Sequence, residues 1–171
     1  MSLLGQVAEL LQRQQVPFAV IGASALAVHG VSRSTFDIDL LVTDRRTLSP
    51  QFWTLDAKVD IRRGDEHDPL AGVIRLRAAG ERDIDVVVGR AAWQAELLES
   101  NLRVELEGTQ VPVVAAAGVI LLKLYAGGLQ DQWDIQQLLA AGTRAALIAA
   151  VDGQAGALPA DARELWQRLR A

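Results

Sequence analysis

Apolar residues near the start of the chain follow a helical period. They lie at Leu3, Leu4, Val7, Leu10 and Leu11. This spacing predicts an amphipathic helix that stops before Pro17. The next run, PFAVIG (17–22), is short, β-branched and aromatic, and ASALAVH (23–29) favours a helix that ends at Gly30. The chain therefore begins with a helix, a strand, a glycine turn and a second helix.

Alternating or β-branched runs dominate the middle of the chain, with turn-rich segments between them. The expected strands are 34–42, 56–63, 71–78, 81–89 and 102–108. Residues 90–100 favour a helix. From Ala115 onward the chain is rich in Ala and Leu, which predicts further helices. These helices are expected to break at Gly127, Gly128, Gly142 and residues 152–159.

This order of elements predicts an α+β fold, because a set of strands precedes a set of helices. We expect a small, mixed, largely hairpin-connected sheet flanked by helices. Residues 1–114 form the α+β core in this interpretation, and residues 115–171 form a C-terminal helical region packed on the same domain. A length of 171 residues, half of them hydrophobic, suits one well-buried domain.

Composition excludes several classes of protein. A net charge of −4 argues against a protein that grips long nucleic acid through its phosphates. The absence of cysteine excludes disulfides, thiolate metal sites and a cysteine nucleophile. The longest apolar run, VPVVAAAGVILL (111–122), is shorter than the roughly 20 residues that span a bilayer. We therefore expect a soluble, cytoplasmic protein.

Two aspartates interrupt the apolar strand VSRSTFDIDLLV (31–42). With a period of two, Asp37 and Asp39 point to one face while Ile38 and Leu40 point to the other. Two neighbouring carboxylates repel unless a cation lies between them. Oxygen ligands without nearby His or Cys suit Mg²⁺ or Mn²⁺. A solvated strand face, or aspartates that cap turns, explains the pair equally well.

The pattern recurs in ERDIDVVVG (81–89), where Asp83 and Asp85 share a face. If this strand neighbours the first, three carboxylates converge, as a two-metal site for phosphoryl or nucleotidyl transfer requires. We prefer Asp85 as the third ligand, since it directly precedes the apolar run VVV, and we interpret Asp83 as a solvated hairpin residue.

Phosphate-binding candidates surround these aspartates in the sequence. Gly22, Ala23 and Ser24 form a turn that opens a helix, where backbone N–H groups can hold a triphosphate. Arg33 and Ser34 precede the Asp pair and could meet phosphates, or they could simply form a charged strand entry.

Lys123 lies in an apolar helix and needs a partner there. It could reach a triphosphate or the carboxylates, or extend its ammonium to the helix edge. Helix capping explains the nearby Asp131 and Asp134. Six arginines could form a surface for an RNA acceptor, although alternating Arg on a solvated hairpin is more common. They are Arg45, Arg46, Arg62, Arg63, Arg75 and Arg77.

The order VIGASALAVHG, VSRSTFDIDLLV and DIDVVVG resembles the nucleotidyltransferase superfamily with the polymerase-β-like fold. The similarity is to small prokaryotic members, which include AbiEii-type toxins and minimal nucleotidyltransferases. Gly22, the Asp37-Ile38-Asp39 motif and Asp85 match the pattern of that superfamily. Ala23 stands where a second Gly or Ser is usual, with Ser24 beside it. The resemblance also covers LLKLYAGGLQDQWDIQQLL (121–139).

This resemblance implies a metal-dependent nucleotidyltransferase that uses an NTP, such as ATP. Asp37, Asp39 and Asp85 would hold Mg²⁺ or Mn²⁺ and carry the catalysis. The acceptor hydroxyl could belong to an RNA end, a protein or a small molecule. A toxin restrained by a cognate antitoxin or partner protein is also implied. The alternative is a nucleotide-binding or regulatory module that keeps the fold without turnover, which Ala23 favours.

Overall fold

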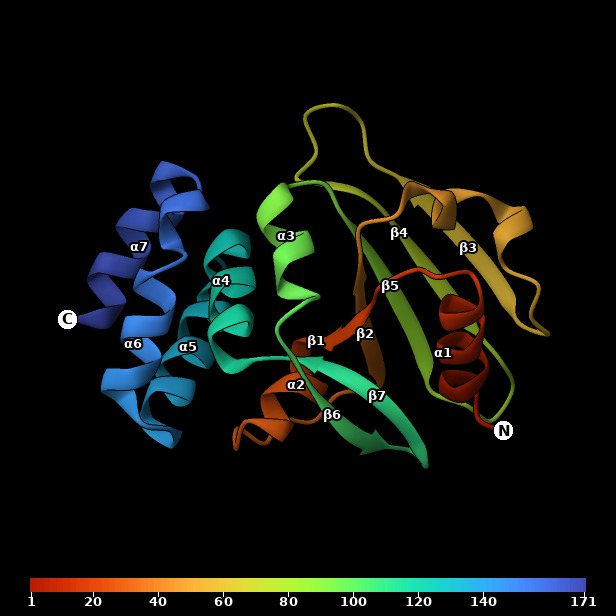
Figure 1. Ribbon diagram of the computed structural model, residues 1–171, viewed down its shortest axis with the longest axis horizontal. Coiled ribbons are helices and arrows are strands. Elements are labelled where there is room, and N and C mark those ends of the chain that lie inside the picture. Colours follow the sequence, from red (N-terminus) through yellow and green to blue (C-terminus); the bar gives the residue numbers. More distant parts are fainter. The chain divides into compact units, whose positions relative to one another are not determined.

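Seven strands form one mixed sheet in the computed structural model, which describes residues 1–171 (Figure 1). The strands are β1 (Ala19–Ile21), β2 (Asp37–Val42), β3 (Lys58–Arg63), β4 (Leu70–Arg77), β5 (Asp83–Gly89), β6 (Asn101–Leu106) and β7 (Thr109–Val114). Their order across the sheet is β3-β4-β5-β2-β1-β7-β6. Central β2 and β5 therefore lie side by side.

Hairpins connect three of the strand pairs. The sequence predicts a largely hairpin-connected sheet, but it does not predict β7 and therefore does not predict the β6–β7 hairpin. Antiparallel pairing joins β3 to β4, β4 to β5, and β6 to β7. Strand β1 is antiparallel to β2, whereas β2 with β5 and β1 with β7 are parallel pairs. The α+β class with a mixed sheet is thus confirmed.

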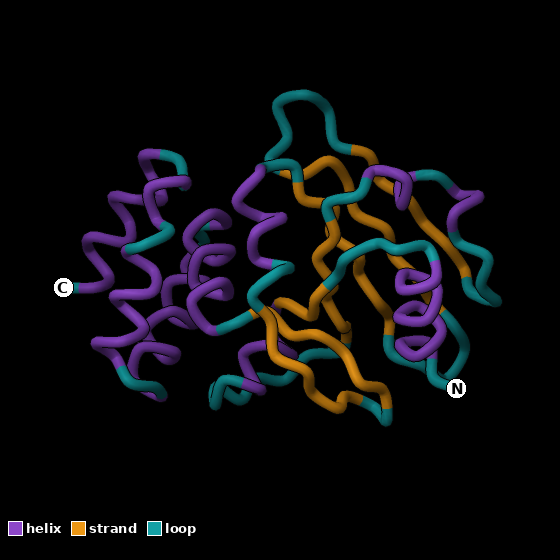
Figure 2. Tube along the Cα trace, in the orientation of Figure 1, coloured by secondary structure: helices purple, strands orange, loops and turns teal.

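Seven α-helices accompany the sheet (Figure 2). They are α1 (Leu3–Arg13), α2 (Gly22–Val28), α3 (Ala92–Leu97), α4 (Ala116–Ala126), α5 (Leu129–Ala141), α6 (Arg144–Asp152) and α7 (Ala160–Arg170). Short 3₁₀ turns are η1 (Arg45–Leu48), η2 (Pro50–Phe52) and η3 (Ala155–Ala157). The chain divides into two compact units. Unit 1 comprises Met1–Ser24 and Thr35–Val114, and unit 2 comprises Ala25–Ser34 and Ala115–Ala171.

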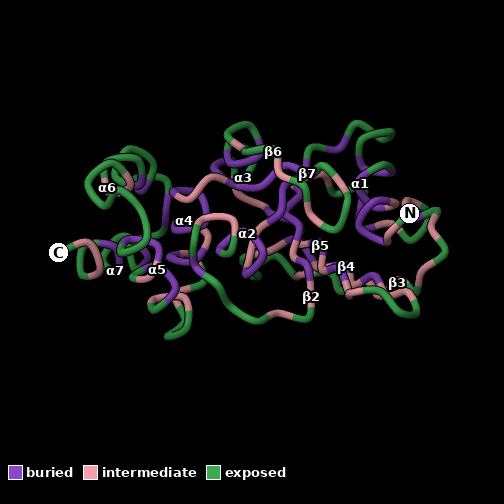
Figure 3. Tube along the Cα trace, turned by 90° about the horizontal axis from the view of Figure 1, so that it is seen from below, coloured by how far each residue is buried: buried purple, intermediate pink, exposed green.

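The two faces of the sheet in unit 1 differ in polarity. Ile38, Leu40, Ile74, Ile84 and Val86 are buried on one face, while the aspartates of β2 and β5 alternate with them. Helix α1 contributes a buried apolar stripe, and the opposite face of β3 and β4 carries no helix of this unit (Figure 3). Each fully buried Leu or Ile stabilises the fold by about 1.5–3 kcal/mol. The face of β2 and β5 that carries the aspartates is therefore polar and partly exposed.

Unit 2 is helical and has its own apolar interior. Ile120, Leu124, Ile135 and Trp166 from α4, α5 and α7 are almost fully buried. The predicted break between helices is confirmed at Gly127, which ends α4 with a φ of 72°. None of the helices combines the length and apolar character needed to cross a membrane.

Strand β7 is the element that the periodicity does not predict. Val111, Val113 and Val114 are buried together with Pro112, so the strand shows no apolar–polar alternation. Proline inside a run also disfavours a strand. Pro112 faces Arg103 of β6, and the pairing with β1 joins Val113 to Val20. Burial on both faces of the sheet therefore replaces the alternation that a half-exposed strand would show.

Candidate functional site

Four carboxylates line one face of β2 and β5. The parallel register places Asp37 opposite Asp83 and Asp39 opposite Asp85. Side chains that lie directly opposite each other on neighbouring strands share a face. All four are partly exposed, because the buried residues between them point to the other face. The sequence predicts convergence of three carboxylates, and Asp83 lies with them on this face.

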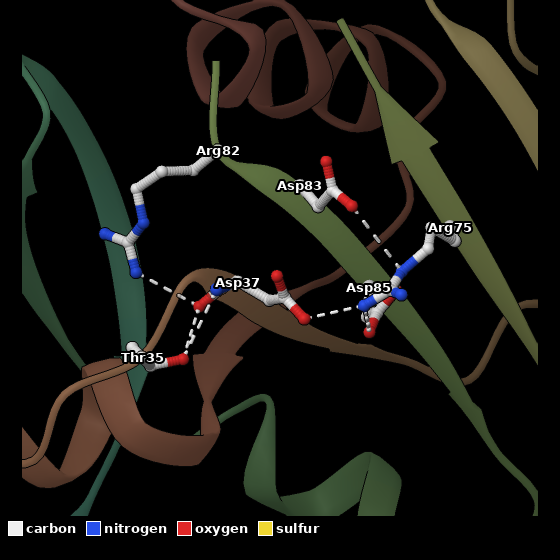
Figure 4. Close-up of polar contacts among 6 residues, drawn as sticks. All are labelled: Thr35, Asp37, Arg75, Arg82, Asp83 and Asp85. Atoms are coloured by element: carbon white, nitrogen blue, oxygen red, sulfur yellow. Dashed lines mark hydrogen bonds and ion pairs between the residues drawn. The ribbon is translucent and has the colours of Figure 1, made fainter. Parts of the chain in front are cut away.

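A guanidinium from β4 lies among the carboxylates of this acidic patch (Figure 4). Arg75 lies opposite Asp85 in the β4–β5 register. Its Nε and Nη2 donate to Asp85 Oδ1 and Oδ2 at 2.8 and 3.0 Å, and Nη2 also donates to Asp37 Oδ2 at 2.6 Å. Asp83 Oδ2 is 3.9 Å from Arg75 Nε. One side chain thus bridges the two strands that bear the aspartates.

The pKa of Arg75 is raised above its ordinary value. The largest cause is the hydrogen bond to Asp85, followed by the negative charge of Asp85 and then of Asp37 and Asp83. An arginine is already charged at neutral pH, so the shift identifies the surroundings as strongly acidic. Sequence reasoning placed Arg75 only among arginines of a hairpin surface. The Arg-x-Arg alternation on β4 was the only sequence signal for Arg75, and it did not indicate that Asp37 and Asp85 are the partners of this side chain.

Hydrogen bonds fix the backbone where β2 begins. The Asp37 N–H donates to Thr35 Oγ1 at 3.3 Å, and Thr35 Oγ1 donates to the Asp37 carbonyl at 3.0 Å. Arg82 Nη2 donates to the same carbonyl at 3.0 Å and its Nη1 pairs with Glu107 at 3.1 Å. These contacts set the direction in which the Asp37 side chain leaves the strand. A Thr two residues before a strand is a weak sequence signal for this role.

The glycine turn lies against Asp39. Gly22 has a φ of 64°, and a Cβ at this position would overlap the Asp39 carboxylate. Glycine is therefore required both by backbone conformation and by close approach. Ala23 and Ser24 follow in the first turn of α2, and each is only 8% exposed. The turn and the Asp39 carboxylate are neighbours, although they are far apart in sequence.

Lys123 belongs to an ion-pair cluster within unit 2. Its Nζ is 2.6 Å from Asp134 Oδ2 and 3.0 Å from Asp131 Oδ1. Arg33 Nη1 donates to the same Asp134 oxygen at 2.8 Å. The Asp134 side chain is fully buried, which makes these partners necessary. Asp131 accepts from the Gly128 N–H and so caps α5, as predicted, but Asp134 lies beyond the first turn and does not cap the helix. Both aspartates hold a nearly buried lysine. Ser34 is exposed.

The carboxylates suit a hard divalent cation by chemical type, since they offer oxygen atoms alone. As they are arranged here they do not form a metal site, because no three His, Cys, Asp or Glu side chains are disposed to hold an ion. Arg75 contacts oxygens of both Asp37 and Asp85. A divalent ion bound by these two residues therefore requires Arg75 to leave at least one of them.

At the level of sequence, the chain matches no family profile and no curated protein. Its structure resembles solved nucleotidyltransferases, so the fold is the polymerase-β-like nucleotidyltransferase fold. One such structure is the solution structure of the antibiotic-resistance factor ANT(2'')-Ia, with a TM-score of 0.56 and 16% identity over 90% of this chain and 91% of that chain.

Two further solved structures agree with this fold. A putative nucleotidyltransferase from Thermotoga maritima, TM1012, has a TM-score of 0.55 and 16% identity, covering 80% of this chain and 90% of that one. ANT(2'')-Ia in complex with adenylyl-2''-tobramycin has a TM-score of 0.53 and 17% identity, covering 98% and 95%. At such low identity the likeness concerns the fold, and the chemistry of this chain must be argued from its own residues.

Proposed function

We propose that this protein is a nucleotidyltransferase, which transfers a nucleotidyl group from an NTP to an acceptor hydroxyl. The observation that supports it most is the parallel register of β2 and β5, which pairs Asp39 with Asp85 beside the Gly22 turn. Carboxylates grouped beside a turn rich in backbone N–H groups suit phosphoryl chemistry. The shared fold of solved nucleotidyltransferases supports the same reaction class.

In this reaction the acceptor oxygen forms a bond to the α-phosphorus of the NTP. The bond from that phosphorus to the bridging oxygen breaks, and pyrophosphate leaves with the electron pair. Asp85 accepts the proton of the acceptor hydroxyl as general base. Its side chain is 21% exposed, so an incoming hydroxyl can reach it from solvent.

Mg²⁺ or Mn²⁺ held by Asp37, Asp39 and Asp85 would supply charge stabilisation at the α-phosphate and the leaving group. Arg75 would give up its hydrogen bonds to at least one of Asp37 and Asp85, since the metal would compete with it for their oxygens. The released guanidinium remains close to the reacting phosphates and can donate to their oxygens.

The nucleotide phosphates are proposed to lie at the turn formed by Gly22, Ala23 and Ser24. Arg33 uses one nitrogen, Nη1, for Asp134, and its side chain is 39% exposed, so its other N–H groups can still donate to a phosphate. Ser34 beside it offers an exposed hydroxyl. Lys123 would contribute to nucleotide binding only if it partly left Asp131 and Asp134.

The adenylylated tobramycin in the ANT(2'')-Ia complex supports ATP as the donor nucleotide. The sequence resemblance to AbiEii-type toxins extends the proposal to a toxin that modifies an RNA end or a protein hydroxyl and is restrained by a cognate antitoxin. In the other version of the proposal, the acceptor hydroxyl belongs to a small molecule.

Transfer of label from each of four α-³²P-labelled NTPs tests the proposal. Purified protein with Mg²⁺ or Mn²⁺ is offered total RNA, total protein and small hydroxyl compounds, and pyrophosphate release is measured in parallel. We expect labelled product and stoichiometric pyrophosphate from the wild-type protein, and a loss of about 10³-fold in Asp85→Asn. Equal signals from both proteins would contradict the proposal.

A nucleotide-binding module without turnover is the second candidate, and the position of Arg75 supports it. A guanidinium already pairs with Asp37 and Asp85, so these two carboxylates have a cationic partner without a metal. This candidate predicts that the protein binds NTP but forms neither labelled product nor pyrophosphate with any acceptor. Isothermal titration calorimetry measures the binding.

A further inference from the structure

A cleft of about 610 Å³ opens over β3, β4 and β5. Charged side chains line most of it, namely Asp60, Arg62, Arg75, Arg77 and Asp85. Asp85 therefore belongs both to the carboxylate patch and to the wall of the cleft. The Gly22 turn lies at the other side of the patch, against Asp39. Asp85, the proposed general base, thus lies between the turn proposed to bind the nucleotide phosphates and this charged cleft.

Strand register places these side chains on one face. Asp60 lies opposite Arg75, which lies opposite Asp85. Arg62 and Arg77 are two residues along from Asp60 and Arg75 and so point the same way. Three positive and two negative groups consequently project from adjacent strands into the same space.

The acidic groups of the cleft already have partners, while several donors do not. Asp60 pairs with Arg77, and Asp85 accepts two hydrogen bonds from Arg75. Arg77 uses only Nη2 for Asp60 and its side chain is 41% exposed, so Nη1 remains able to donate. Arg62 is exposed, and its side chain forms no ion pair or hydrogen bond in the structure. The unsatisfied groups are therefore cationic donors, which complement an anion that accepts hydrogen bonds.

We propose that this cleft binds a phosphate group of the acceptor, and so selects acceptors that carry a phosphate near the hydroxyl to be modified. The inference rests on the proposed nucleotidyl transfer, because it assigns the acceptor side of the same site. Arg62 and Arg77 bind the phosphate, which brings the acceptor hydroxyl to Asp85. A nucleoside monophosphate and the 3′ end of an RNA strand offer this chemistry equally, whereas a polycationic amino sugar does not.

The test compares two acceptors that differ only in phosphate, together with an RNA strand. Adenosine, adenosine 5′-monophosphate and a single-stranded RNA 12-mer with a free 3′ hydroxyl are offered with α-labelled NTP. We expect the phosphate-bearing acceptors to be preferred over adenosine in wild type. In Arg62→Ala the ratio of kcat/KM for the monophosphate over adenosine should fall about tenfold. Arg62→Lys should recover part of the ratio, and Arg103→Ala, an exposed strand arginine outside the cleft, should leave it unchanged.

Direct binding separates a failure of this inference from a failure of the proposed reaction. Fluorescence anisotropy measures the labelled 12-mer, and competition measures the monophosphate, with wild type and Arg62→Ala. Arg62-dependent binding without any transfer would support the cleft and contradict the reaction. Three results would each overturn the cleft assignment. The first is transfer by Arg62→Ala with an unchanged ratio of kcat/KM for the monophosphate over adenosine. The second is an effect of Arg62→Ala on the KM of the NTP alone, and the third is the absence of phosphate-dependent binding. Binding of the 12-mer without the monophosphate would identify a strand as the source of the phosphate.

Discussion

Arg75 contacts carboxylates of both β2 and β5, so its removal changes the charge balance of the whole patch. At the proposed metal site, a divalent ion would compete with this guanidinium for the same oxygens. The carboxylates lie so close together that they require a cation between them. Which cation is bound therefore depends on the binding free energy of the metal ion relative to that of the guanidinium. This competition can be measured without any assay of activity.

Arg75→Met should make the protein more responsive to Mg²⁺. The variant loses the guanidinium and leaves Asp37 and Asp85 to repel each other, so we expect a lower melting temperature in EDTA. The rise on adding Mg²⁺ should exceed that of wild type by about 2 °C or more. Differential scanning fluorimetry measures both, with Arg103→Met as the matched control. Identical Mg²⁺ shifts in the Arg75 variant and wild type would show that Arg75 does not compete with the metal.

Gly22→Ala should destabilise the protein by about 2–3 kcal/mol, because the added methyl group meets a positive φ and the Asp39 carboxylate together. Gly108→Ala is the matched control, since Gly108 has a φ of 74° and nothing within 4 Å of an added Cβ. It should cost about 1 kcal/mol. Urea denaturation gives both values. Equal losses would mean that Asp39 does not limit the space at the turn.

Helices α4 and α5 are joined by the ion pairs of Lys123 with Asp131 and Asp134. Asp134 also holds Arg33, which belongs to the 25–34 segment of the same unit. A buried charge that keeps its partners is tolerated, and removal of one partner is costly because the other stays buried. The stability of this helix pair therefore depends on polar residues within an apolar interior.

Asp134→Asn should lower the free energy of unfolding by about 3 kcal/mol, because the Lys123 ammonium and Arg33 lose a fully buried counter-charge. Asp131→Asn should cost about 1 kcal/mol, since this side chain is 25% exposed and Lys123 keeps Asp134. Guanidinium denaturation followed by circular dichroism compares the two variants. A larger loss in the Asp131 variant would show that Asp134 is not the principal partner of the lysine.

At the scale of the whole molecule, a ligand that binds only the folded chain stabilises it. Mg²⁺ with NTP at a hundredfold excess over the dissociation constant should add about 2.7 kcal/mol. Asp39→Asn should lose most of this gain and lower nucleotidyl transfer by about 10³-fold, because a proposed ligand is removed. Denaturant melts with and without Mg²⁺ and NTP measure the gain. A variant that gains as much as wild type would exclude a metal-binding role for Asp39.

The helices and most strands of this protein could be predicted from local pattern alone. The apolar period of α1, the breaks at Gly22 and Gly127 and the alternation in β2 and β5 are each set within a few residues. The same alternation placed Asp37 with Asp39, and Asp83 with Asp85, on common faces. Side-chain direction in a strand is a property of the backbone, so these statements needed no knowledge of the fold.

Only the tertiary structure decided which strands and charges meet. Strand β7 lacks alternation because both of its faces are buried, and a strand buried on both faces leaves no period of two to detect. The parallel register of β2 with β5, the bridging of two aspartates by Arg75 and the pairing of Arg33 with Asp134 join residues far apart in sequence. Charge pairing depends on distances of a few ångströms, and only folding sets such distances between segments so widely separated.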